Sequence, residues 1–372
     1  MQKSRAWIEI NLENLEYNIR QIKNNISEGT EIMAVIKANA YGHGDVLIAK
    51  KLNEIGITNF AVATLEEGIH LRENKIKGNI LILGYTHPHY VDKIIENDLI
   101  QTLVDEQYSK QIEKFNNTNK QLKVHIKINT GMNRIGFSPK NINEIENIFN
   151  NSKIKVTGVF SHLAVSDEEN EESINFTKKQ MQEFENCVKL LKAKNYEVGK
   201  VHIQNSYGMF YKTDFKYDYI RTGIFIYGIT DKNEVHLKPV LSLKARVESV
   251  HSIEKDETVG YGRNYIAKGQ EKIAAISIGY ADGYPRELSN KGANVIINGQ
   301  YAEIIGKICM DQLMVNVTHI EDISSGDIVT LIGKDNNNEI YVNEIASKAS
   351  TIPYEIISRL GTRLPRISEQ EM

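Results

Sequence analysis

A lysine stands at the end of an apolar run, where burial would penalise its positive charge. The run EIMAVIKA, residues 31–38, has the character of a buried strand, and NAYGHG follows it. One explanation for Lys37 is structural, because a lysine stem can pack while its amine reaches solvent. The chemical explanation is a Schiff-base lysine, since partial desolvation lowers the pKa of the amine and makes it a better nucleophile toward an aldehyde.

Polar side chains also stand at the ends of later apolar runs. If these runs are parallel strands of a barrel, the side chains share its C-terminal edge, where the loops build the site. They are Arg134, His162, Asn205, Ser206 and Arg221. The last two loops, which frequently hold a phosphate in such barrels, carry Ser206 and Gly223. An aldehyde cofactor with a phosphate is pyridoxal 5′-phosphate (PLP), and an arginine can pair with its ring nitrogen.

The elements that position these residues are short β-rich runs between residues 31 and 228. Eight occur in order: EIMAVIKA, FAVAT, ILILG, IQTLV, KVHIKIN, VTGVFSHL, KVHIQNS and YIRTGIFIYG. Several are almost continuously apolar, as in parallel strands covered on both faces, and segments of helical spacing such as GDVLIAKKLNEIG separate them. The pattern predicts an α/β fold with an N-terminal (β/α)8 TIM barrel; a doubly wound open sheet is the alternative.

Beyond residue 236 the pattern changes to strands joined by turn signals, such as Asn298-Gly299 and Ser325-Gly326. This predicts a mainly antiparallel β domain, followed by a helix over residues 343–360 that Pro353 interrupts. We expect a PLP-binding barrel domain over residues 1–235 and a β domain over residues 236–372. The N-terminal strand is expected to contribute to the second domain.

Composition excludes several classes of partner. The net charge is −3 and the isoelectric point is near 6.4, which gives no electrostatic reason to expect nucleic acid or an anionic membrane as a partner. No segment approaches the roughly 18 apolar residues that span a bilayer, and the N-terminus lacks a signal-type apolar core, so we expect a cytoplasmic protein. Cys187 and Cys309 are far apart, and the histidines share no metal-ligand spacing. We therefore predict no metal site.

The chain resembles the alanine racemases, a family of PLP-dependent enzymes, over almost its whole length. AVIKANAYGHG is similar to the PLP-lysine signature of that family. Eight further blocks follow in the family's order: GMNRIGF, SHLAVSD, HIQNS, RTGIFIYG, VGYGR, IGYADGYPR, KICMDQ and TIPYE. The resemblance implies interconversion of L-alanine and D-alanine, the latter for cell-wall peptidoglycan, by a homodimer with shared active sites.

The resemblance also implies a role for each matching residue. Lys37 would bind PLP covalently and act as one proton-transfer base, and Tyr261, from the second subunit, would act as the other. The positions that match the cofactor site are Lys37, Tyr41, His162, Asn205, Ser206, Arg221, Gly223, Ile224 and Tyr354. Arg134 and the backbone N–H of Met310 match positions that hold the substrate carboxylate.

Lys127 matches a lysine that is often N-carboxylated in this family, where the modified side chain orients the arginine corresponding to Arg134. Burying an unpaired lysine in an apolar strand is costly, and a carbamate would give Arg134 an anionic partner. The residues alone leave a buried salt bridge or a solvated strand end equally open. His162, taken alone, also has an ordinary explanation as a hydrogen-bonded core histidine.

Two bases on opposite faces of the α-carbon are the simplest means of moving a proton from one face to the other. Alternatives within the same framework are a racemase of serine or lysine, or a barrel-type PLP decarboxylase. A PLP-binding protein without activity is a further class, but that group resembles the barrel alone. The VGYGR and CMDQ blocks of the β domain favour the racemase, and Tyr354 in TIPYE favours alanine over serine.

Overall fold

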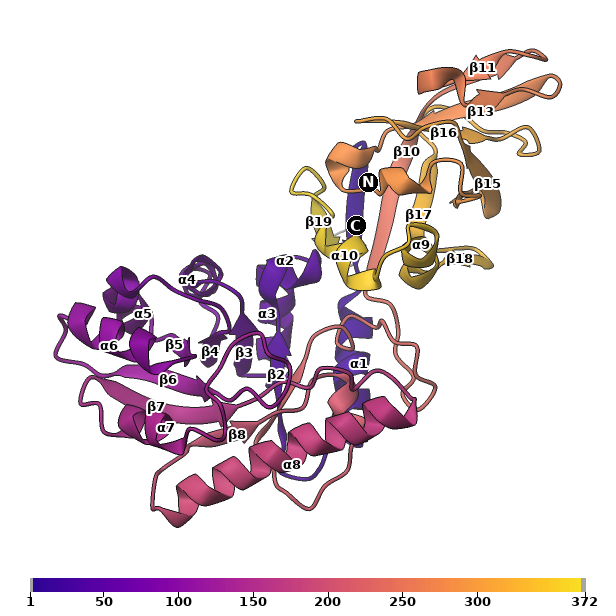
Figure 1. Ribbon diagram of the computed structural model, residues 1–372. Coiled ribbons are helices and arrows are strands. Elements are labelled where there is room, and N and C mark those ends of the chain that lie inside the picture. Colours follow the sequence, from indigo (N-terminus) through magenta and orange to yellow (C-terminus); the bar gives the residue numbers. More distant parts are fainter. Residues whose placement is uncertain (1–2, 369–372) are drawn as a thin grey trace. The chain divides into compact units, whose positions relative to one another are not determined.

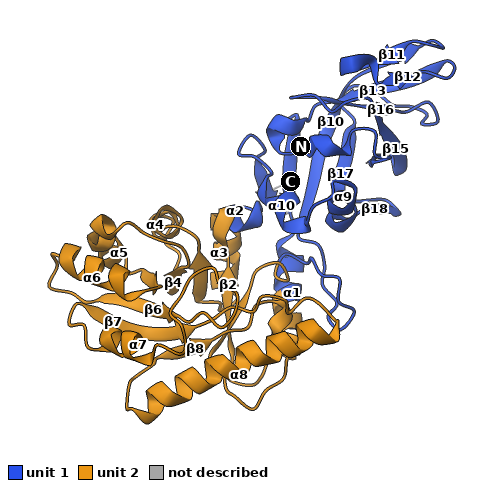
Figure 2. Ribbon diagram, viewed as in Figure 1, with its two compact units in different colours: residues 1–18, 39–44, 227–372 blue, residues 19–38, 45–226 orange. Residues whose placement is uncertain are grey.

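The computed structural model describes residues 3–368, which pack into two compact units (Figures 1 and 2). The barrel unit comprises residues 19–38 and 45–226, and the sheet unit comprises residues 1–18, 39–44 and 227–372. Two helices, α1 (Leu12–Asn25) and α2 (Lys37–Tyr41), have residues in both units.

The barrel unit is built on eight parallel strands. In sheet order they are β8 (Lys200–His202), β7 (Ile154–Phe160), β6 (Leu122–Lys127), β5 (Ile100–Leu103), β4 (Asn79–Ile82), β3 (Asn59–Val62), β2 (Glu31–Val35) and β9 (Tyr219–Thr222). Backbone bonds from Asp218 N to Val201 O (2.8 Å) and from Arg221 N to Gln204 O (3.0 Å) connect the two end strands. The strands therefore form a barrel, as predicted, and the open doubly wound sheet is excluded.

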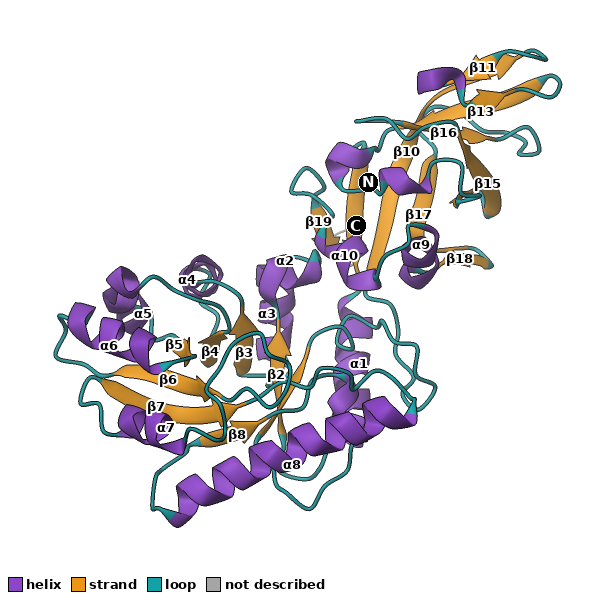
Figure 3. Cartoon of the chain, viewed as in Figure 1, coloured by secondary structure: helices purple, strands orange, loops and turns teal. Residues whose placement is uncertain are grey.

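Helices surround these strands, as Figure 3 shows. They are α3 (Asp45–Glu54), α4 (Leu65–Glu73), α5 (Val91–Glu96), α6 (Glu106–Phe115), α7 (Ile142–Phe149) and α8 (Glu171–Ala193). The predicted helix after Gly44 is α3, which buries Ile48, Ala49 and Leu52 on one face. Strands β3 and β5 are buried at every position, which is why their sequences lack the alternation of half-exposed strands.

The sheet unit is mainly antiparallel, also as predicted. Its nine-stranded sheet contains β18 (Asn338–Ile340), β17 (Ile328–Asp335), β14 (Asn294–Ile297), β15 (Gln300–Ile305), β16 (Leu313–Asn316), β13 (Glu271–Ile276), β10 (Leu241–Ile253), β1 (Ala6–Ile10) and β19 (Arg366–Ser368). The long strand β10 pairs with β13 and also with β17, so six of these strands close on themselves. Strand β1 is antiparallel to β10. A short hairpin, β11 (Thr258–Val259) with β12 (Tyr265–Ile266), lies outside this sheet.

The two turn signals have different outcomes. Asn298 and Gly299 both have positive φ, +49° and +73°, and join the paired strands β14 and β15, so this hairpin is confirmed. Ser325-Gly326 leads into β17, whose partners are β10, β14 and β18 rather than the preceding strand β16. The prediction of a hairpin at this place is therefore wrong. The helix with Pro353 is two helices, α9 (Val342–Lys348) and α10 (Pro353–Ser358), because proline lacks the N–H that a helix interior needs.

Across residues 3–368, no helix combines the length and the apolar character needed to cross a bilayer.

Candidate active site

Lys37 lies just past the end of the barrel strand β2 and is partly buried. Burial, and secondarily the positive charge of Arg134, lowers the pKa of its amine, while the carboxylate of Glu67 opposes this shift. The lowered pKa of the Lys37 amine agrees with the expectation for a nucleophilic amine.

The four residues after Lys37 form a left-handed turn. Ala38, Asn39, Ala40 and Tyr41 have φ between +52° and +53°, although none is glycine. This conformation costs about 1–2 kcal/mol per residue, so local contacts must hold it. Gly42 ends the turn where a Cβ atom would lie 2.0 Å from the carbonyl oxygen of Ile357, which leaves room only for glycine.

Glu67 supports the start of this turn, a role that the sequence analysis missed. Its Oε1 accepts a hydrogen bond from Ala38 N at 2.7 Å, and its Oε2 accepts from Ala63 N at 2.6 Å. The same carboxylate forms a capping box with Thr64 at the start of α4. The spacing Thr64-x-x-Glu67 is a capping-box pattern and predicts the helix start, but nothing in it indicates the bond to Ala38.

Arg221 is buried inside the barrel, where both of its Nη atoms form hydrogen bonds. Nη1 donates to His202 Nδ1 at 2.7 Å, and Nη2 donates to Ser161 O at 2.6 Å, Ile203 O at 3.2 Å and His162 Nδ1 at 3.1 Å. These bonds do not use Nε–H. Burial lowers the pKa of Arg221 to about 9, so the guanidinium stays charged at neutral pH.

His162 is therefore part of a polar network rather than an isolated core histidine. Its pKa is lowered well below the ordinary value by burial first and then by the charge of Arg221. The neutral ring can accept the hydrogen bond from Arg221 through Nδ1.

Lys127 ends β6 and is only 4% exposed. Its Nζ donates to Ile128 O at 3.0 Å and lies 5.4 Å from the centre of the Phe160 ring. Burial, followed by the charges of Arg221 and Arg134, lowers the pKa of its amine to about 7. A solvated strand end is excluded by this burial, and among the described residues no carboxylate lies in ion-pair contact with the amine.

The two last loops of the barrel bring Ser206 and Gly223 together. Gly223 N donates to Ser206 Oγ at 3.3 Å, and this hydroxyl also lies 3.1 Å from Thr222 Oγ1. Asn205 Oδ1 accepts from Gly208 N and from Ser166 Oγ, both at 2.8 Å, which fixes the loop that carries Ser206. Ile224 is buried next to Gly223. The edge thus offers a hydroxyl and a backbone N–H side by side.

Of the remaining predicted residues, Arg134 is exposed in the barrel unit, whereas Tyr41, Tyr354, Tyr261 and Met310 belong to the sheet unit. There the rings of Tyr41 and Tyr354 lie 5.9 Å apart, and Tyr41 also packs on Tyr227 at 5.2 Å. Burial raises the pKa of Tyr41, and Tyr354 adds to this shift. Tyr261 begins the short helix η3 (Tyr261–Arg263) and is 71% exposed within the chain; Met310 is also exposed.

A buried carboxylate, that of Asp282, holds the loop of Met310. The sequence analysis did not predict this role of Asp282. Asp282 is fully buried, accepts from Gly279 N at 3.0 Å, and pairs with Arg5 at 2.6 Å. Asp282 fixes a segment that is hydrogen-bonded to the Met310 loop. In that segment Tyr280 N donates to Cys309 O and Ala281 N donates to Met310 O, both at 3.0 Å. The sequence IGYADGY carries no local signal that Asp282 is buried. Within residues 3–368, no cluster of His, Cys, Asp and Glu could hold a metal ion.

Comparison with known proteins identifies the family. Residues 10–231 match the family model "Alanine racemase, N-terminal domain" and residues 240–368 match "Alanine racemase, C-terminal domain". An alanine racemase of Carboxydothermus hydrogenoformans is 42% identical over 371 residues, covering 97% of this chain and 99% of the relative.

Two solved structures extend the comparison. The alanine racemase of Clostridium difficile 630 superimposes with a TM-score of 0.93 at 33% identity, covering 100% of this chain and 98% of that one. The alanine racemase of Bartonella henselae with covalently bound pyridoxal phosphate has a TM-score of 0.84 at 31% identity, covering 98% and 99%. With both family models matched in order, the chain belongs to the alanine racemase family and is an isomerase.

Proposed function

We propose that this protein interconverts L-alanine and D-alanine with PLP as its cofactor. The observation that carries the proposal is the pairing, on one barrel, of an amine of lowered pKa at Lys37 with the buried, hydrogen-bonded guanidinium of Arg221. The covalently bound PLP of the Bartonella henselae relative supports the choice of cofactor. D-alanine for peptidoglycan is the product that this proposal assigns to the reaction.

The residues present fit PLP. Lys37 would hold the aldehyde carbon, and Arg221 has its Nε–H left over for the pyridine nitrogen, since its other bonds use Nη1 and Nη2. The hydroxyls and backbone N–H groups that suit the phosphate come from Tyr41, Ser206, Gly223, Ile224 and Tyr354. The loop of Asn205 and the ring of His162 would support them. When bound, PLP withdraws electrons from the α-carbon of the amino acid and so acidifies its hydrogen.

Two side chains would move the proton at the α-carbon. Lys37 is the base on one face, because burial lowers the pKa of its amine and so favours the neutral form, which can accept a proton. Tyr261 is the base on the other face and comes from the second subunit of a homodimer. Its exposure within the single chain, 71%, is compatible with a side chain that completes the site of a partner. Arg134 and the N–H of Met310 would hold the substrate carboxylate.

Arg221 also limits the reaction to racemisation. A guanidinium remains a proton donor in a hydrogen bond without giving up its proton, so the pyridine nitrogen stays unprotonated. Arg221 would therefore leave a bound PLP a weaker electron acceptor than a carboxylic acid partner would, which disfavours side reactions.

Lys127 is proposed to carry an N-carboxyl group. A carbamate forms when the neutral amine attacks carbon dioxide and loses one proton, and a pKa near 7 supplies the neutral amine. The charges that depress this pKa, those of Arg221 and Arg134, would stabilise the resulting anion. The modification thus replaces a repulsive neighbour of Arg134 by an attractive one.

The decisive experiment is conversion of L-alanine to D-alanine by the purified, PLP-loaded protein, beside a panel that includes serine, lysine and histidine. We expect alanine to have the highest kcat/KM. A higher value for serine or lysine would establish the alternative racemase, and release of carbon dioxide would establish a decarboxylase. Binding of PLP with no turnover of any amino acid would establish the non-enzymatic alternative.

A further inference from the structure

The backbone N–H of Met310 is a free hydrogen-bond donor. It has no acceptor within residues 3–368, and the residue is 53% exposed. The carbonyl oxygen of Met310, in contrast, accepts a hydrogen bond from Ala281 N at 3.0 Å. A donor without an internal partner can bind an anion such as a carboxylate, provided that it points toward the place of that anion.

The direction of this N–H is set by the peptide bond between Cys309 and Met310. Among the described residues no peptide bond is cis, and in a trans peptide the carbonyl oxygen and the N–H point to opposite sides. Cys309 O accepts a hydrogen bond from Tyr280 N at 3.0 Å. The N–H of Met310 therefore points away from the segment 279–282, which carries Tyr280.

Gly279 allows this segment to approach the peptide closely. A Cβ atom at position 279 would lie 2.4 Å from the carbonyl oxygens of both Cys309 and Met310. The φ of Gly279, −149°, is ordinary for any residue, so the need for glycine comes from this contact and not from the backbone conformation.

Asp282 holds the segment in place. Its side chain is fully buried, and Oδ2 accepts from Gly279 N at 3.0 Å, while Oδ1 lies 2.6 Å from Arg5 Nη2 and 3.4 Å from Arg363 Nε. Arg5 also donates through Nη1 to Ser277 O at 2.6 Å, so it contacts the chain on both sides of Gly279. Asp282, Gly279, Arg5 and Arg363 are called the Asp282 network below.

We propose that Asp282 and Gly279 are positioning residues that aim the N–H of Met310 at the carboxylate of the substrate. This inference rests on the proposed function, in which that N–H holds the carboxylate. Because the donor is oriented before the substrate arrives, the loop does not have to be ordered on binding, and this raises the affinity.

Propionate, which is alanine without its amine, is the probe for this contact. It is titrated into the PLP-loaded protein labelled with ¹⁵N-methionine and should shift the Met310 amide resonance saturably. Met310→Leu identifies that resonance among the signals of the eight methionines. In Asp282→Asn, which loses the charge that pairs with the arginines, and in Gly279→Ala, the affinity for propionate should fall about tenfold.

The kinetics provide a second measurement. The substrate carboxylate does not react, so its contact with the N–H is the same in the ground state and in the transition state. In both variants we therefore expect KM for alanine to rise about tenfold while kcat stays within about twofold of the wild-type value.

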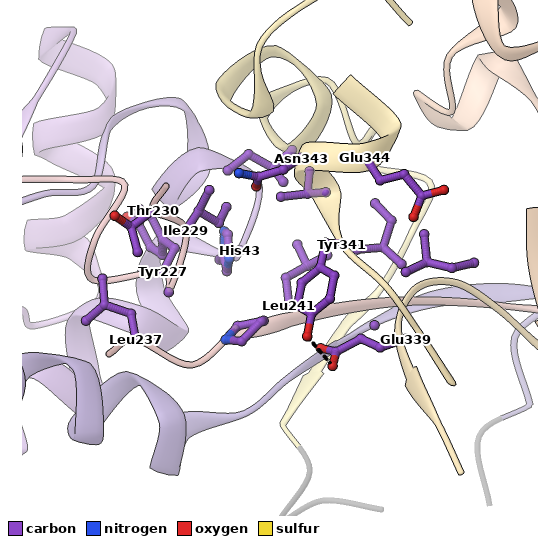
Figure 4. A pocket seen from close by; sticks show the side chains of 17 residues that line it. His43, Tyr227, Ile229, Thr230, Leu237, Leu241, Glu339, Tyr341, Asn343 and Glu344 are labelled. Carbon is purple, nitrogen blue, oxygen red and sulfur yellow. Dashed lines mark hydrogen bonds between the residues drawn. The ribbon is translucent and has the colours of Figure 1, made fainter. Parts of the chain in front are cut away.

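Two carboxylates elsewhere in the sheet unit provide the controls. Asp335 accepts from Gly299 N at 3.1 Å, the same type of bond as in the Asp282 network. Figure 4 shows Glu339 bonded to Tyr341 at the wall of a cavity that no residue of the Asp282 network lines. Asp335→Asn and Glu339→Gln should therefore bind propionate as wild type does.

The outcomes separate this inference from the proposed function. If wild type racemises alanine and binds propionate at Met310, but both variants equal wild type in affinity and KM, the positioning role is refuted and the proposed function stands. If wild type turns over no amino acid and propionate shifts no methionine amide, both are refuted. Circular dichroism shows whether each variant is folded. Should Asp282→Asn not fold, Gly279→Ala decides, because it keeps every hydrogen-bonding group of the Asp282 network.

Discussion

Arg221 Nη1 lies 2.7 Å from His202 Nδ1, and this bond fixes the tautomers of two buried histidines. Because a guanidinium only donates, His202 Nδ1 must be unprotonated and its hydrogen must lie on Nε2. His202 Nε2 lies 2.9 Å from His125 Nδ1, which is then the acceptor. A chain of oriented donors thus runs from β9 through β8 to β6 and holds Arg221 in one position.

Breaking this chain should weaken both the fold and the reaction. His202→Phe keeps the ring volume but gives Arg221 Nη1 no acceptor, so we expect the free energy of unfolding to fall by about 1–3 kcal/mol. We also expect the fractional decrease in kcat to be larger than any fractional increase in KM. His202→Asn can place its Oδ1 near the former Nδ1 and should recover most of both. Urea unfolding and steady-state kinetics measure the two effects. Equal behaviour of the two variants would exclude the acceptor role of His202.

The same chain predicts a pH dependence of stability. Burial lowers the pKa of His125 to about 3, with a contribution from Arg221, whereas in the unfolded chain it is about 6.5. Between these values the unfolded state binds the extra proton, so the stability present above pH 6.5 is lost as the pH falls toward 3. In His125→Asn, which keeps an acceptor for His202, the decrease between pH 7 and pH 4.5 should be smaller by about 2–3 kcal/mol.

Urea unfolding at the two pH values checks this expectation. His251→Asn is the control, because His251 is exposed on β10 and its replacement should leave the pH dependence unchanged. An equal decrease in wild type and His125→Asn would show that His125 titrates normally in the folded state.

The proposed carbamate on Lys127 has a direct spectroscopic signature. After equilibration with ¹³C-bicarbonate, the folded protein should give one protected carbamate resonance in the ¹³C NMR spectrum. It should grow as the pH rises through about 7, where the amine loses its proton. Lys127→Met should remove the resonance. Lys123→Met, on the same strand but with its amine paired to Asp98 at 2.6 Å, should keep it. A spectrum identical in wild type and Lys127→Met would reject the modification.

The barrel strands could be predicted because each is a short apolar run, and Lys37, Arg134 and Ser206 could be placed because strand ends share one edge. The left-handed turn at residues 38–41 could not be predicted, since Ala and Tyr disfavour positive φ, only Asn39 tolerates it well, and contacts outside the turn hold it. The bond from Ala38 to Glu67 joins residues 29 positions apart. The pairing of β10 with β17 is similarly non-local, so the turn at Ser325-Gly326 could not be assigned from its own residues.

The strain in this turn can be measured at Ala38, which is exposed and has φ of +52°. Glycine adopts this conformation without the Cβ penalty, and Ala38→Gly keeps the N–H that bonds to Glu67, so it should stabilise the protein by about 1 kcal/mol. Ala193→Gly is the control at the exposed end of α8, where glycine should destabilise by about 0.5–1 kcal/mol. Chemical unfolding gives both values. Destabilisation by Ala38→Gly equal to that of the control would show that the turn is unstrained.

The last prediction tests whether Lys37 and Tyr261 act together across two subunits. Lys37→Ala and Tyr261→Phe should each be inactive, and Tyr261→Phe should unfold at the wild-type urea concentration because the ring is 71% exposed within the chain. If the two variants are co-expressed with different tags and purified as a hybrid dimer, one site combines an intact Lys37 with an intact Tyr261. The hybrid should then show about half of the wild-type kcat per dimer.

A second hybrid gives the opposite outcome and controls for chance recovery. When one subunit carries both substitutions and the other is wild type, each shared site lacks either the lysine or the tyrosine, so we expect almost no activity. If both bases came from the same chain, the first hybrid would be inactive and the second would keep about half of the activity. The pair of hybrids therefore distinguishes a shared site from two independent ones by which dimer is active, without relying on the size of either rate.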